Sequence, residues 1–122
     1  MRISTEDLLR FIGSSFRSVW ALELVLVLKA DRRRWPRQEL VATMRASDLV
    51  VAKALEALEA AGLVAATDDE AEYTPMNQEV AALVDRAEQL YRKRPDAVRR
   101  AIVSASSDEA TAFADAFRLR RD

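Results

Sequence analysis

The chain contains few of the residue types that usually act in catalysis or metal binding. The 122-residue chain contains no cysteine and no histidine, which excludes thiolate metal ligands, disulfides and the commonest general base. Glu23 lies inside the apolar run VWALELVLVL and is the one carboxylate placed to act as an acid, although such a group is more often paired with an arginine. No glycine-rich phosphate loop occurs, and DDEAE lacks the ligand spacing of a calcium loop. We therefore expect no enzymatic activity, no metal and no cofactor.

Charged side chains are arranged in blocks. Residues 29–45 carry six basic and two acidic groups (net +4), residues 47–74 carry one and seven (net −6), and residues 86–122 carry nine and six (net +3). The whole chain has a net charge of −1. The first block holds the candidates for contacts with nucleic-acid phosphates, namely Arg32, Arg33, Arg34 and Arg37. The alternative is a solvated loop whose arginines pair with the acidic block of the same or a neighbouring molecule.

The elements that position these side chains begin with two apolar helices. Ser4 stands three residues before Asp7, which is the pattern of a capped helix start, and Gly13 is expected to end this helix. Its apolar face consists of Leu8, Leu9, Phe11 and Ile12. A second helix is expected from Ser15 to Ala30. It is apolar nearly all round, with Trp20 in its stripe, and this is typical of a central helix.

Shorter elements follow. Pro36 suits the first turn of a short helix, RQELVATMR, and Ser47 is a good N-cap for the next helix. That helix buries Val51, Leu55 and Leu58 and ends before Gly62. LVAA and AEYT then form a small hairpin around TDDE, and NQEVAALVDRAEQLYRKR forms a long helix that Pro95 ends. Residues 96–105 and 108–120 are expected to form two final helices.

This order resembles the winged helix-turn-helix family. The resemblance is carried by PRQELVATMRASDLVVAKALEALEAAGLV, residues 36–64, and extends over about residues 16–76. The chain is most similar to small MarR-like bacterial transcription regulators, in which terminal helices pair two subunits. The resemblance implies a mainly α single domain, 1–122. Its parts are an N-terminal helix (1–14), a winged helix-turn-helix core with a small β-hairpin wing (15–76) and a C-terminal helical extension (77–122).

The resemblance implies a transcription regulator that binds double-stranded DNA. Arg32, Arg33, Arg34 and Arg37 would then bind backbone phosphates, and Lys53 would be the one donor on the helix that enters the major groove. That helix and the wing are otherwise acidic or poor in donors. The alternative is therefore a protein–protein interaction module on the same scaffold, whose partner-binding residues are Asp48, Leu49, Val50, Asp68 and Asp69.

Both chain ends carry apolar side chains that need a cover. A homodimer is expected through Leu8, Phe11 and Ile12 of the first helix and Phe113 and Phe117 of the last. The alternative is that these faces pack on the long helix of the same chain. The longest apolar run has about half the length that spans a bilayer, and MRISTEDLLRF does not look like a signal peptide. We therefore expect a cytoplasmic protein without membrane contact.

Overall fold

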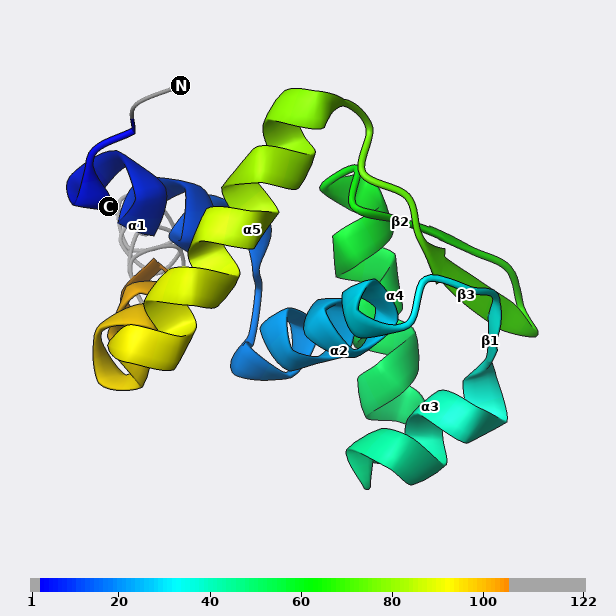
Figure 1. The fold of residues 1–122 in the computed structure, drawn as a ribbon. Coiled ribbons are helices and arrows are strands. Elements are labelled where there is room, and N and C mark those ends of the chain that lie inside the picture. Colours follow the sequence, from blue (N-terminus) through cyan, green and yellow to red (C-terminus); the bar gives the residue numbers. More distant parts are fainter. Residues whose placement is uncertain (1–2, 106–122) are drawn as a thin grey trace, which may run out of the picture.

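The fold is mainly helical, with a small antiparallel sheet. The structure is a computed structural model that describes residues 3–105. Its elements in chain order are α1 (Thr5–Ser15), α2 (Val19–Ala30), β1 (Trp35–Pro36), α3 (Arg37–Met44), α4 (Asp48–Ala60), β2 (Val64–Ala66), β3 (Glu70–Tyr73) and α5 (Gln78–Lys93) (Figure 1). Residues 95–105 form one more helix. The helix expected at 108–120, with Phe113 and Phe117, lies outside the described residues.

Local capping accounts for most helix starts. The side chains of Ser4, Ser18, Ser47 and Asn77 accept a backbone N–H from the third residue that follows each of them. The distances at the two predicted caps are 3.0 Å from Asp7 N to Ser4 Oγ and 3.1 Å from Val50 N to Ser47 Oγ. Such caps satisfy N–H groups that have no partner within the helix. The sequence-based assignment of these two starts is therefore confirmed.

The break between the first two helices differs from the prediction. Gly13 does not end α1, which continues to Ser15, and α2 begins only at Val19. Gly13 instead faces the helix at 95–105, where an added Cβ would lie 3.2 Å from both the Ala101 carbonyl oxygen and the Ala105 Cβ. The glycine therefore permits two helices to cross closely, and it does not act as a stop signal.

The core is centred on α2 and α4. Leu22, Leu24, Val25 and Leu28 of α2 are buried, and they meet Val51, Leu55 and Leu58 of α4. Leu55 and Leu58 are fully buried, as the apolar spacing predicts. The expectation for Trp20 is wrong, because this side chain is 41% exposed. Trp20 precedes Ala21, which shares the buried face with Val25 and Leu28, so it is turned by about 100° from that face.

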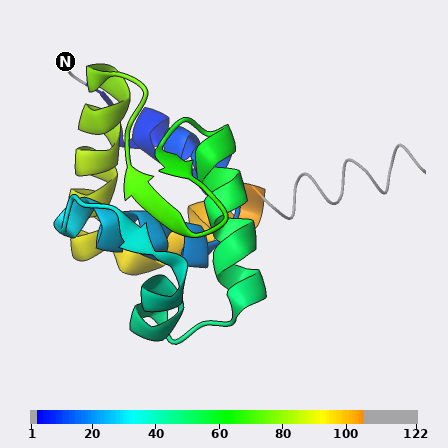
Figure 2. The same ribbon diagram turned by 90° about the vertical axis from the view of Figure 1, so that its right-hand side faces the viewer.

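The sheet contains the expected hairpin and one unexpected strand. Its order is β1-β3-β2 with both pairs antiparallel, and the register pairs Val64 with Tyr73 and Trp35 with Ala71. β1 has only two residues and includes Pro36, so the sequence contains no strand signal there. Figure 2 shows the hairpin beside α4, which it contacts through β2. Trp35 lies at the edge of the core and is 7% exposed.

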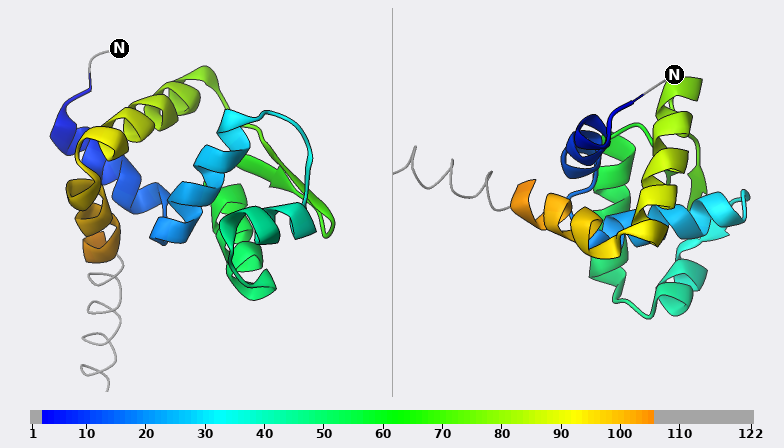
Figure 3. Two further views of the ribbon diagram at one scale, coloured as in Figure 1. Left: turned by 60° about the horizontal axis from the view of Figure 1, so that its bottom comes forward. Right: turned by 60° about the vertical axis from the view of Figure 1, so that its left-hand side comes forward.

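The N-terminal helix is covered by the same chain. α1 packs against α5, and Leu8 and Ile12 are buried in one cluster with Val84, Val98 and Ile102 (Figure 3). Phe11 is half-buried and makes an edge-to-face contact with Phe16. The alternative of intramolecular packing therefore describes α1 correctly.

In the part of the chain that the structure describes, no single helix is long and apolar enough to cross a membrane, and α1 and α2 are bent by 99° at the break between them.

Candidate interaction surface

The candidate surface is the outer side of α4 together with the tip of the hairpin. The α4 cap at Ser47 and the buried stripe of Val51, Leu55 and Leu58 decide which positions face outward. The outward side chains near the start of α4 are Asp48, Leu49 and Lys53, which are exposed, and Val50, which is half-buried. Leu49 is 63% exposed, so a large apolar side chain faces solvent at the start of α4. The structure thus brings together the residues that the sequence proposed for base contact and for partner contact.

The turn between α3 and α4 presents a further cation. Arg45 has a φ of 53° and a ψ of 41°, in the left-handed region, and its N–H donates to the Ala42 carbonyl at 3.3 Å. This conformation costs a non-glycine residue about 1–2 kcal/mol. Arg45 is exposed beside the surface, but sequence reasoning did not select it. No sequence signal distinguishes it, because the left-handed turn results from how α3 and α4 pack.

Arg33 is enclosed by its own chain. Its guanidinium hydrogen-bonds both carboxylate oxygens of Glu39, and its Nε lies 2.8 Å from the Asp31 carboxylate. The same group stacks on Trp35, 3.9 Å from the ring centroid. The hydrogen bonds from Glu39 and then Asp31 raise the pKa of Arg33 above its ordinary value. Its charge is therefore balanced by two carboxylates. The guanidinium already donates hydrogen bonds to Asp31 and Glu39 and is poorly placed to bind a phosphate.

The other three predicted arginines divide into one bound and two exposed groups. Arg37 donates from its backbone N–H to the Asp69 carbonyl at 2.8 Å and from its Nε to the Thr67 carbonyl at 2.9 Å. Arg32 lies over the Tyr73 ring, 5.1 Å from the centroid, and Arg34 is 4.0 Å from Glu72 with a side chain that is 75% exposed. Of the predicted phosphate contacts, only Arg32 and Arg34 therefore remain open to a ligand.

The hairpin tip is ordered and acidic. The Thr67 hydroxyl oxygen accepts the N–H groups of Asp69 at 3.3 Å and Glu70 at 3.0 Å, and Arg37 holds the tip against the start of α3. The tip residues Asp68 and Asp69 are exposed, so the predicted partner-binding carboxylates face solvent. An acidic projection held in this way would repel a duplex and attract a basic surface.

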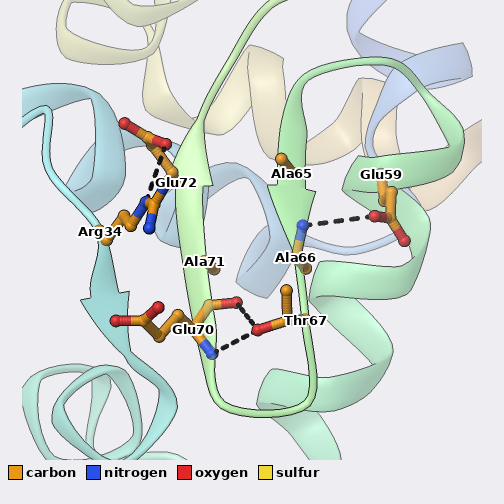
Figure 4. Close-up of a pocket in the computed structure, with 8 residues that line it drawn as sticks. All are labelled: Arg34, Glu59, Ala65, Ala66, Thr67, Glu70, Ala71 and Glu72. Atoms are coloured by element: carbon orange, nitrogen blue, oxygen red, sulfur yellow. Dashed lines mark hydrogen bonds and ion pairs between the residues drawn. The ribbon is translucent and has the colours of Figure 1, made fainter.

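Two shallow hollows flank the surface. One is about 460 Å³ and is lined by Arg17, Lys53, Glu56, Ala57 and Ala60. The other is about 280 Å³ on the outer side of the sheet, where Glu59 accepts the Ala66 N–H at 3.3 Å and Arg34 approaches Glu72 (Figure 4). Within residues 3–105, no group of three or more acidic side chains is placed to hold a metal ion. Both hollows are open and suit a macromolecular partner better than an enclosed small molecule.

Glu23 is occupied by a structural contact. The Tyr91 hydroxyl donates to Glu23 Oε1 at 3.0 Å, and Arg99 donates to the Tyr91 oxygen at 3.4 Å. The nearest partner is thus a tyrosine, and the expected arginine stands one step further away. Burial first, and the hydrogen bond to Glu23 second, raise the pKa of Tyr91, whereas Arg99 opposes the shift. This chain of contacts joins α2, α5 and the helix at 95–105.

Comparisons of the chain with models of protein families, with curated proteins and with solved structures find no match. Function is therefore inferred from the described surface itself. That surface contains an exposed leucine, a single lysine on α4 and an acidic tip. Of the four arginines beside it, Arg33 and Arg37 are bound within the chain, and Arg32 and Arg34 are exposed.

Proposed function

We propose that the chain is a winged-helix protein–protein interaction module. α3 and α4 would be its helix-turn-helix, and the β2–β3 hairpin would be its wing. The element order and the sheet order β1-β3-β2 beside α3 and α4 support this assignment. The left-handed Arg45 that closes the turn and the buried Leu55 and Leu58 support it as well.

The observation that carries the proposal is the exposure of Leu49 at the start of α4. In the resembled family this position faces the major groove, where polar donors read base edges. A leucine there contributes little to base reading, but burying such a side chain in a protein pocket contributes about 1.5–3 kcal/mol. Arg33 and Arg37 add support, because each has acceptors within the chain.

The acidic side chains of the candidate surface indicate the chemistry of the partner. Asp48 flanks the leucine, and Asp68 and Asp69 project from the tip that Arg37 holds. A partner surface with an apolar pocket and a basic rim would complement this arrangement. The pocket would supply most of the affinity, and the basic rim would mainly raise the association rate.

The test is photo-crosslinking in cells of the natural host. A photoreactive phenylalanine derivative replaces Leu49 in the full chain, and the matched control replaces Ala82, which is exposed on α5. We expect a protein adduct at position 49 that is absent at position 82 and is lost after Asp68→Lys/Asp69→Lys. Circular dichroism checks that each variant is folded. Crosslinking of position 49 to nucleic acid, or to nothing, would contradict the proposal.

The second candidate function is that of a transcription regulator that binds double-stranded DNA. The observation in its favour is that Lys53 is exposed on α4 and that Arg32, Arg34 and Arg45 are exposed nearby. If α4 reads DNA, Lys53→Gln should abolish any preference between sequences, and Arg32→Gln/Arg34→Gln should weaken binding to all duplexes alike. The interaction-module proposal expects neither change.

Homodimer formation stays a prediction, and fewer of its predicted contact residues remain available. Leu8 and Ile12 are in the core of their own chain and are not available to a second copy. Phe11 is half-buried, and Phe113 and Phe117 lie outside the described residues. Sedimentation equilibrium of the full chain at tens of micromolar tests the homodimer. A monomer at that concentration would contradict it.

A further inference from the structure

A second charged surface lies on the far side of the molecule from the hairpin tip. It forms at the corner where α5 meets the helix at 95–105, coloured yellow in Figure 1. We define the basic elbow as the five cations of this corner, Arg92, Lys93, Arg94, Arg99 and Arg100, all of which are exposed. Residues 92–100 contain one acid, Asp96, so this stretch has a net charge of +4 from five bases and one acid.

Contacts within the chain account for only part of this charge. Arg92 pairs with Glu88 at 3.3 Å, and Arg99 pairs with Asp96 at 3.8 Å while it also donates to Tyr91. Cations in the last turn of α5 also stabilise the negative end of the helix dipole. Lys93, Arg94 and Arg100, however, form no ion pair with any residue that the structure describes. The elbow thus contrasts with the arginines around the start of α3, where Arg33 and Arg37 are bound by their own chain.

The backbone gathers the elbow at one corner. α5 ends at Lys93, Arg94 is its C-cap, and Pro95 begins the next helix in a new direction (Figure 3). The five cations therefore lie within nine residues on the two sides of this corner, and all of them are exposed. A shallow hollow of about 290 Å³ lies alongside, lined by Arg99, Arg100, Val103 and Ser104. Guanidinium groups and a hydroxyl are the donors that contact phosphate oxygens.

We propose that the basic elbow binds the phosphate backbone of double-stranded DNA without reading its sequence. A duplex supplies closely spaced negative charges, and contacts with it need no apolar anchor. A protein partner usually supplies its affinity through buried apolar or aromatic anchors, and Val103 is the one large apolar side chain that lines this hollow. An anionic membrane also attracts basic clusters, so it is a competing outcome of the test below. This surface is distinct from α4, so the inference goes beyond the proposed function and does not depend on it.

The test is a salt titration of the full chain with a short fluorescein-labelled duplex of mixed sequence, followed by anisotropy. Arg94→Gln/Arg100→Gln removes two elbow cations, and the matched control Arg10→Gln/Arg86→Gln removes two exposed cations, one on α1 and one in the middle of α5, that belong to neither proposed surface. Each phosphate contact contributes roughly 0.9 to the slope of log affinity against log salt, so the elbow variant should lower this slope by about two. Its loss of affinity from 50 to 200 mM salt should then be roughly tenfold smaller than for the wild type. The control variant should bind as the wild type does.

Three results would overturn the inference. They are no wild-type binding at low salt, equal weakening by both double variants, and binding to anionic phosphatidylglycerol vesicles without binding to duplex. The outcome is separable from that of the proposed function, because crosslinking at position 49 concerns a different surface. We expect the elbow variant to retain that crosslink. In the wild-type chain, absence of the protein crosslink at position 49 together with salt-dependent duplex binding would contradict the α4 proposal and leave the elbow proposal intact.

Discussion

Arg37 and Thr67 are thirty residues apart in the chain, and the Nε of Arg37 donates to the Thr67 carbonyl oxygen at 2.9 Å. This contact makes the hairpin tip part of one unit with α3. The two carboxylates at the tip are therefore held at the start of α3, and the proposed partner would meet them as a preformed surface.

Arg37→Ala should loosen the hairpin tip without unfolding the domain. One hydrogen bond of this kind contributes about 0.5–1.5 kcal/mol, so the backbone amides of the tip should exchange hydrogen roughly 2–10-fold faster. Native-state hydrogen exchange by NMR measures this directly. Arg34→Ala is the matched control. The Arg34 side chain is 75% exposed, and its one ion pair, with Glu72, is long at 4.0 Å. Equal protection in both variants would show that Arg37 does not hold the tip.

Gly13→Val should destabilise the packing of α1 on the helix at 95–105. The added Cβ meets the Ala101 carbonyl and the Ala105 methyl at 3.2 Å, and the further methyl groups increase the overlap. Overpacking at a tight contact costs about 1–3 kcal/mol. Urea denaturation should show this loss for Gly13→Val and a much smaller one for Ser14→Val, which places the same side chain at an exposed position of the same helix.

Gly62→Ala should cost stability for two separable reasons. Gly62 has a φ of +77°, which costs an L-residue about 1–2 kcal/mol. An added Cβ would also overlap the terminal methyl of Met76, which would have to move away. In a Met76→Ala background the steric part should vanish and the backbone part should remain. If Gly62→Ala is equally harmful in both backgrounds, the methionine contributes nothing to the requirement for glycine.

Tyr73→Phe should stabilise the protein and reduce its sensitivity to alkali. The Tyr73 hydroxyl is buried and has no hydrogen-bond partner among the described residues. Burial first, and the nearby Asp85 second, raise the pKa of the phenol above its ordinary value of 10.0. The unfolded chain therefore loses this proton at lower pH than the folded chain does, and stability falls as pH rises above about 10.

Removal of this hydroxyl should leave stability less dependent on pH in that range and should add about 1 kcal/mol at neutral pH. Thermal unfolding measured from pH 7 to 11 tests both effects. Tyr91→Phe serves as the comparison, since the Tyr91 hydroxyl is bonded to Glu23 and Arg99 and its loss should destabilise. A lower midpoint for Tyr73→Phe at neutral pH would contradict the expected gain.

The features that the sequence predicted correctly are those determined by neighbours along the chain. Ser47 caps α4 through a bond to Val50, and Leu55 and Leu58 are buried because helical spacing places them on one face. Gly62 ends that helix region through its own backbone conformation. Each depends on contacts within about one helical turn, so the local sequence contains the needed information.

The tertiary structure decided what no local pattern contains. It placed Gly13 against Ala101, and it added β1 to the sheet through pairing with β3. It also gave the arginines different roles, since Arg37 reaches a hairpin thirty residues away and Arg94 forms no ion pair with a described residue. Long charged side chains take whichever partner the packing brings near. The sequence by itself therefore determined the helices, their buried faces and the acidic and basic blocks, and only the folded chain decided which charges remain for a partner.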